Sequence, residues 1–133
     1  MKHVDYFKLQ AKNFMRDFKT RNKDETGIYQ YNPRFFPDID DIILSYDIEE
    51  DDFTLMNAQH IIALLAGFGK WSDLLHASEA KLELGKLLLE HRQESDSFGT
   101  PILSSWEMYQ ENLSLGDEGM LAVFKAMYLN QDE

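Results

Sequence analysis

The chain has 133 residues, a formal net charge of −11 and no cysteine. A chain of this length folds as one domain that buries about two-thirds of its unfolded surface, and the lack of cysteine excludes disulfides, a thiolate nucleophile and a zinc–thiolate site. The sequence shows neither an apolar leader nor a run of membrane-spanning length. We therefore expect a cytoplasmic protein without membrane contact.

The charge is divided unevenly along the chain. Residues 1–23 carry seven basic and two acidic residues, a net charge of +5, whereas the remainder carries six basic and twenty-two acidic residues, a net charge of −16. So acidic a body disfavours general nucleic-acid binding, which depends on neutralising phosphates. It favours solubility and basic partners, although charge alone identifies no partner.

Residues 1–21 are predicted to form a basic amphipathic helix, because Val4, Phe7, Ala11, Phe14 and Phe18 recur at spacings of three and four. A basic stripe lies about a third of the circumference away from this apolar face. Its members are candidates for an interaction surface: Lys8, Lys12, Arg16, Lys19 and Lys23. We favour cations that are solvated or lie against the acidic body, and the alternative is a docking surface for nucleic acid or a phosphate ligand. No base-stacking aromatic pattern accompanies the stripe.

Residues 22–37 are predicted to be a loop, since turn residues and two prolines interrupt any periodicity. The loop contains four aromatic residues: Tyr29, Tyr31, Phe35 and Phe36. Aromatic side chains serve readily as packing anchors. We therefore favour a loop that caps the core over an aromatic ligand pocket.

Residues 38–46 are predicted to be a short helix, followed by an acidic connector over 47–52. Eight carboxylates fall in this stretch without a basic residue: Asp38, Asp40, Asp41, Asp47, Glu49, Glu50, Asp51 and Asp52. An EF-hand loop requires a glycine at its sixth position, and this run has none. A solvated acidic surface is the preferred interpretation, and weak divalent-cation binding is the second.

The most apolar stretch, residues 54–76, is predicted to be a buried helix capped by Thr54, a turn at Gly67, and a second helix led by Trp71. We expect the inside of this corner to be filled by Phe68 and Trp71, with no strand anywhere in the chain. On this basis Trp71→Ala is expected to cost about 3–5 kcal/mol. The predicted core residues of the whole chain are Phe14, Ile62, Leu65, Gly67, Phe68, Trp71, Leu74, Trp106 and Phe124.

The residues Ala58-Gln59, Ala63, Gly67-Phe68, Trp71 and Leu74 follow the pattern A-Q-x-x-x-A-x-x-x-G-F-x-x-W-x-x-L. This pattern resembles a small helical module of bacterial proteins, found ahead of some ankyrin-repeat regions and in short glyoxalase-related proteins. An upstream helix often accompanies that module, and Leu9 to Lys19 is similar to it. The resemblance implies packing residues and a helical fold, and it carries no activity or catalytic residues to this chain.

Residues 54–93 are predicted to hold the central helices, and residues 100–129 the C-terminal helices, with Thr100-Pro101 as a helix start. Within 78–93, leucines are distributed so widely that they indicate either wide burial or a partner face. We include Leu84 and Leu88 in the candidate interaction surface.

The chain has little catalytic patterning. Its four histidines show no H-x-x-x-H or H-E-x-x-H spacing, the serine motif G-x-S-x-G is absent, and carboxylate pairs are too common to be informative. A helix-turn-helix reader is rejected, because the helix beginning at Trp71 offers no Arg or Lys to DNA. No catalytic, cofactor-binding or metal-binding residue is predicted.

We predict an all-α, single compact bundle of about six helices over residues 1–133. Three classes of function are compatible with it. The leading one is a non-enzymatic protein-interaction or regulatory module whose partner is another protein, with a homo-oligomer left open. The second is nucleic-acid or phosphate binding through the basic stripe, and the third is an enzyme with a carboxylate or histidine site.

Overall fold

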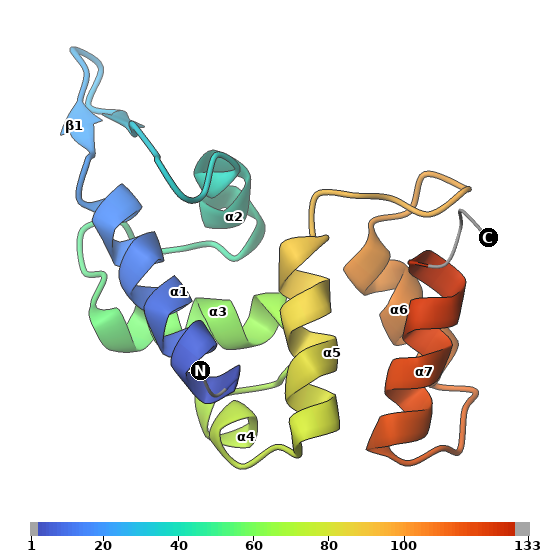
Figure 1. Cartoon of the computed structure of the whole chain (residues 1–133). Coiled ribbons are helices and arrows are strands. Elements are labelled where there is room, and N and C mark those ends of the chain that lie inside the picture. Colours follow the sequence, from blue (N-terminus) through green and yellow to red (C-terminus); the bar gives the residue numbers. More distant parts are fainter. Residues whose placement is uncertain (1–2, 130–133) are drawn as a thin grey trace.

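The computed structural model describes residues 3–129, which form seven helices and one small hairpin (Figure 1). This confirms the all-α fold class, and the helix number is close to the six expected. The elements in chain order are α1 His3–Phe18, β1 Asn22–Lys23, β2 Tyr29–Gln30, α2 Ile39–Ser45, α3 Leu55–Leu65, α4 Trp71–Leu75, α5 Glu79–Glu90, α6 Ile102–Gln110 and α7 Asp117–Tyr128. None of the helices in the described range is long and apolar enough to cross a membrane.

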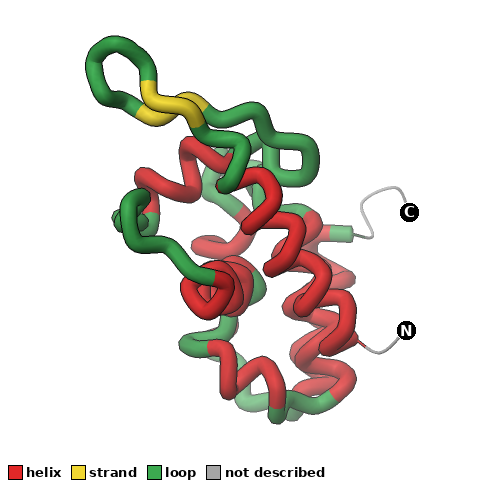
Figure 2. The backbone as a smooth tube through the Cα atoms, turned by 90° about the vertical axis from the view of Figure 1, so that its left-hand side faces the viewer, coloured by secondary structure: helices red, strands yellow, loops and turns green. Residues whose placement is uncertain are grey.

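The hairpin corrects the expectation that the chain contains no strand. Asn22 pairs with Gln30, and Lys23 with Tyr29, in an antiparallel ladder. The Asp24 carboxylate shapes the turn by accepting the backbone N–H groups of Thr26 (2.8 Å) and Ile28 (3.0 Å). Figure 2 shows the hairpin projecting from the helical body. The turn chemistry was visible in the sequence, but each strand is too short to show an apolar alternation.

Two apolar cores share helix α5, which stands between the α1–α4 group and the α6–α7 group (Figure 1). Leu82 and Leu89 of α5 belong to the first core, and Leu84 and Leu88 belong to the second. We refer to the two groups of helices as the first and second lobes. A helix apolar on two sides is normally enclosed by neighbours, and this explains the wide distribution of leucines in α5.

The segment after the hairpin is fixed to the first lobe by a buried carboxylate. Asp17 of α1 is 1% exposed and accepts the backbone N–H groups of Arg34 (2.8 Å), Phe35 (2.8 Å) and Phe36 (2.6 Å). The Phe36 ring is buried against Phe14, with centroids 5.2 Å apart. The segment therefore packs on the core as the capping interpretation expects.

The central corner forms at the predicted positions. The Thr54 hydroxyl accepts the Asn57 N–H at the start of α3, and Gly67 after its end has φ +87°. The Phe68 N–H closes the last turn by donating to the Ala63 carbonyl (2.9 Å), and its ring is buried.

Two of the predicted core residues are less buried than expected. Trp71 is only partly buried, at the edge of the first core, because it is the first residue of the short helix α4. Gly67 is exposed. The remaining predicted core residues are buried: Phe14, Ile62, Leu65, Phe68, Leu74, Trp106 and Phe124.

Candidate interaction surface

Four basic side chains form the outer face of α1. Lys8, Lys12 and Arg16 are exposed on α1, about a third of the circumference away from its buried phenylalanines. Lys19 directly follows α1, and its backbone N–H still donates to the Met15 carbonyl (3.0 Å). We call these four residues the α1 basic face: Lys8, Lys12, Arg16 and Lys19.

Lys23 does not belong to this face. The chain leaves the helical path after Phe18, so Lys23 lies in β1 with its Nζ 5.1 Å from the centroid of the Tyr29 ring. The predicted basic stripe extended one turn beyond the end of α1, because a helical projection does not show where a helix ends.

The cations of the α1 basic face have no partner within residues 3–129. None of their side chains forms an ion pair, a hydrogen bond or a ring contact in this range. Other basic side chains are engaged with aromatic rings or carboxylates: Arg21, Lys23, Arg34, Lys81, Lys86, Arg92 and Lys125. Apart from Lys70, the unengaged basic side chains of the described chain thus gather on one face.

The four cations of the face are regularly spaced, and few acidic side chains of α1 offset their charge. From Lys8 to Lys19 the rise of 1.5 Å per residue gives a line of charge about 16 Å long. Asp5 is the one exposed acid of α1, while Asp17 points into the protein and is occupied by backbone N–H groups. Exposed like charges at helical spacing repel one another weakly. An acidic binding partner would relieve that repulsion.

Leu84 and Leu88 do not belong to an exposed surface, and this corrects their inclusion in the candidate interaction surface. They are 7% and 3% exposed and pack in the second core. Near Leu88, the Gly67 backbone approaches closely, since an added Cβ would lie 3.0 Å from Leu88 Cδ1. The face of α5 that the sequence offered to a partner is covered by α6 and α7.

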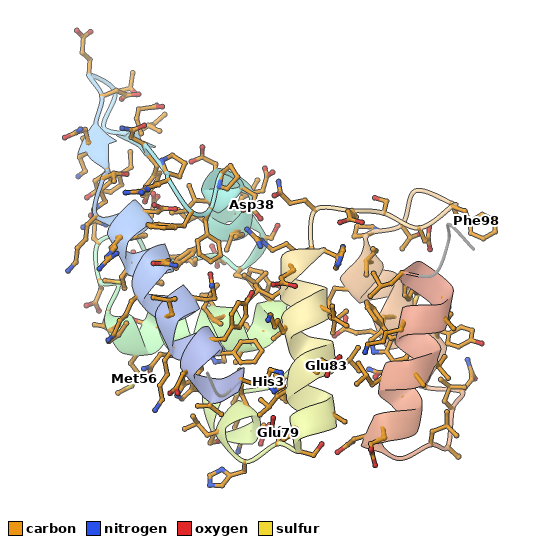
Figure 3. All side chains as sticks on the ribbon, viewed as in Figure 1. His3, Asp38, Met56, Glu79, Glu83 and Phe98 are labelled. Atoms are coloured by element: carbon orange, nitrogen blue, oxygen red, sulfur yellow. The ribbon has the colours of Figure 1, made fainter. Side chains whose placement is uncertain are left out.

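Two exposed apolar side chains lie on α1 and on the neighbouring start of α3, and neither was predicted to belong to an interaction surface. Leu9 is 43% exposed on α1, and Met56 is 76% exposed in the first turn of α3 (Figure 3). α3 begins against the second half of α1, because Phe53 just before it stacks on Phe18 with centroids 4.4 Å apart. A helical projection places Leu9 about 60° from Lys12, so its position was available from the sequence. The position of Met56 depends on the tertiary packing.

The acidic connector is joined to the hairpin. Arg21 lies between the rings of Phe18 and Tyr29, 4.6 Å from each centroid, and donates to the Glu50 carbonyl. The Tyr31 hydroxyl donates to the Glu50 carboxylate (2.6 Å); burial and this hydrogen bond raise the pKa of Tyr31. In the described chain no group of three His, Asp or Glu side chains is placed to hold a metal ion.

Three of the four histidines, His3, His76 and His91, contact a carboxylate or a backbone carbonyl. His3 lies 2.7 Å from a Glu79 carboxylate oxygen (Figure 3), and His91 lies 2.6 Å from one of Glu94. His76 contacts the Ser72 carbonyl at 2.8 Å, and His60 is exposed on α3. None of the described histidines lies within hydrogen-bond distance of a hydroxyl group that it could activate as a nucleophile.

An open groove of about 490 Å³ lies between the lobes, and sequence reasoning gave no signal for it. It is lined by α2, α6, the end of α3 and the segment that follows α5, with Tyr46, Leu65 and Leu103 among its walls. At one edge Arg92 donates two hydrogen bonds to Asp38 (2.7 and 2.8 Å). The two charges satisfy each other, so the groove presents no free ionic group at this position.

Comparison of the chain with protein-family models, with curated proteins and with solved structures gives no match. The resemblance of residues 58–74 to the bacterial helical module therefore stays a prediction.

Proposed function

We propose that this protein is a non-enzymatic interaction module and that the α1 basic face is its binding surface for an acidic protein. The observation that supports this most directly is the concentration of cations without a partner among residues 3–129, at Lys8, Lys12, Arg16 and Lys19, in a chain of net charge −11. Acidic groups are abundant in such a chain, yet none of those in the described range pairs with this face. Electrostatic complementarity mainly gives association rate and specificity.

Nucleic-acid or phosphate binding through the same face is the second candidate. The α1 basic face supports this candidate as well, because its cations attract phosphates as they attract carboxylates. The net charge of −16 on residues 24–133 works against it, because a long polyanion extends beyond the face and meets that acidic body. A compact acidic patch on a protein avoids most of this repulsion, because exposed charges more than about 8 Å apart are largely screened at physiological salt.

Affinity purification from the native host tests the proposal. Three baits are compared: wild type, the triple variant Lys8→Gln/Lys12→Gln/Arg16→Gln, and the control Lys70→Gln/Asn112→Asp/Ser114→Asp. Both triple variants change the net charge by the same amount, and all six positions are exposed. We expect a protein that wild type and the control retain and that the α1 variant loses, before and after nuclease treatment.

Two results would contradict the proposal. If the α1 variant and the control retain the same proteins in equal amounts, the α1 basic face is not the binding surface. If the retained material disappears on nuclease treatment, the second candidate is favoured. Circular dichroism of all three baits confirms that they share one fold.

A further inference from the structure

We propose that the α1 basic face binds an acidic amphipathic helix of the partner, and that Leu9 and Met56 supply apolar contacts beside the cations. This inference rests on the proposed function and names the chemistry of the partner segment. It predicts a binding surface formed by α1 together with the first turn of α3.

The spacing of the cations favours a helical ligand. Lys8, Lys12, Arg16 and Lys19 recur every three or four residues, so they follow one line along α1. A second α-helix with carboxylates at the same spacing has the same rise per residue and can place them opposite these cations. Helices pack side by side at 8–10 Å, a distance that long Lys and Arg side chains bridge readily.

The neighbouring apolar side chains favour a protein over a polyanion. Leu9 lies on the side of the cationic line that faces away from the start of α3. Leu55, 41% exposed, and Met56 lie in the first turn of α3, next to the second half of α1, and the Met56 side chain points away from the core (Figure 3). A partner helix that carries leucines beside its carboxylates can bury these groups, whereas phosphates cannot.

Base stacking has no platform at this surface. The one aromatic residue of α1 outside the buried apolar face is Tyr6, which is half-buried under Lys86, with the Lys86 Nζ 4.9 Å from its ring centroid. Binding of single-stranded nucleic acid relies on exposed aromatic rings together with cations. The surface has cations and aliphatic groups, a combination suited to a helix face.

Fluorescence anisotropy with synthetic probes tests the inference on the full chain. The first probe is an acidic helical peptide of about 18 residues, roughly 27 Å long, with glutamates on one line and leucines on both flanks. The second peptide has the same composition in scrambled order. The third probe is a single-stranded RNA of the same net charge.

Two double variants test the contribution of the apolar contacts. Leu9→Ser/Met56→Ser removes them, and Leu75→Ser/Met108→Ser is the matched control. The control pair is also exposed, at 38% and 69%, and lies on α4 and α6. We expect the amphipathic peptide to bind wild type and the control equally. Its affinity for Leu9→Ser/Met56→Ser is expected to fall about fivefold, because partial burial of two apolar side chains is lost. The scrambled peptide and the RNA are expected to bind more weakly than the amphipathic peptide, with the same affinity for this variant as for wild type.

The inference is overturned if the scrambled peptide or the RNA binds as tightly as the amphipathic peptide, or if Leu9→Ser/Met56→Ser binds like wild type. In the latter case a loss of binding by Lys8→Gln/Lys12→Gln/Arg16→Gln still supports the proposed function, with an unstructured acidic partner. If that charge variant also binds like wild type, both proposals fail.

Discussion

The two lobes are stabilised in different ways, although both pack against α5. The three buried polar side chains of the described chain, Asn13, Asp17 and Asp38, all lie on elements of the first lobe. The buried set of the second lobe consists of leucine, isoleucine and aromatic side chains around Trp106. The first lobe includes a long non-helical segment whose N–H groups need acceptors. The second lobe consists mainly of the helices α6 and α7, and in the loop before α6 the partly exposed Asp96 carboxylate, not a buried one, accepts the N–H groups of Phe98 and Thr100.

This difference implies two kinds of sensitivity. Loss of one carboxylate in the first lobe leaves several backbone N–H groups without their acceptor. Loss of one large side chain in the second lobe leaves a cavity that neighbours fill only in part. Substitutions in each lobe can therefore be compared directly.

The largest effect is expected from Trp106→Ala, at about 3–5 kcal/mol of unfolding free energy. Trp106 is 1% exposed and meets Phe124 edge-on, with centroids 5.3 Å apart. Trp71→Ala is its control and is expected to cost about 1–2 kcal/mol, less than the sequence alone suggested, because the Trp71 indole is partly buried. Denaturant titration of both variants, followed by circular dichroism, gives the two values. A loss for Trp106→Ala no larger than that for Trp71→Ala would contradict the expectation that the fully buried indole contributes more to stability.

Asp17→Ala is expected to cost about 2–4 kcal/mol, since the three N–H groups that it accepts lose their partner. Hydrogen exchange should rise at Arg34, Phe35 and Phe36 and stay unchanged in α7. Asp5→Ala, an exposed acid on the same helix, is the control and is expected to change little. An equal rise in hydrogen exchange in both lobes would contradict a stabilising role of Asp17 that is confined to the first lobe.

Most of the fold was accessible from the sequence because local signals agreed with tertiary packing. The period of Phe7, Ala11, Phe14 and Phe18 predicted α1, and Gly67 marked the end of α3. The hairpin was missed because its strands, two residues each, form through the Asp24 turn and have no apolar pattern of their own.

The interaction surface was predictable only in part, for a physical reason. Lys8, Lys12 and Arg16 lie on the face that a helical projection assigns to solvent. Burial of Leu84 and Leu88 depends on α6 and α7, which lie later in the chain, and a projection of α5 alone does not contain them. The proximity of Met56 to α1 likewise arises from helix packing.

The smallest predicted effect concerns the hairpin of the first lobe and its dependence on pH. Hydrogen bonds from Thr26, first from its hydroxyl, and from the Ile28 N–H lower the pKa of Asp24 from 3.8 to about 2. The folded pKa lies below the unfolded value, so ionised Asp24 stabilises the hairpin fully above the unfolded pKa. This contribution is lost as the pH falls through the folded value.

Carboxyl chemical shifts recorded by NMR during an acid titration measure this pKa, and amide shifts of Thr26 and Ile28 should follow the same transition. Asp24→Asn should remove the transition from those amides, whereas Glu25→Gln, an exposed neighbour in the same turn, should leave it in place. Trp106 and Phe124 signals should not respond to Asp24, because the second core has no contact with the turn. A midpoint at the ordinary aspartate value would show that the turn is not held by this carboxylate.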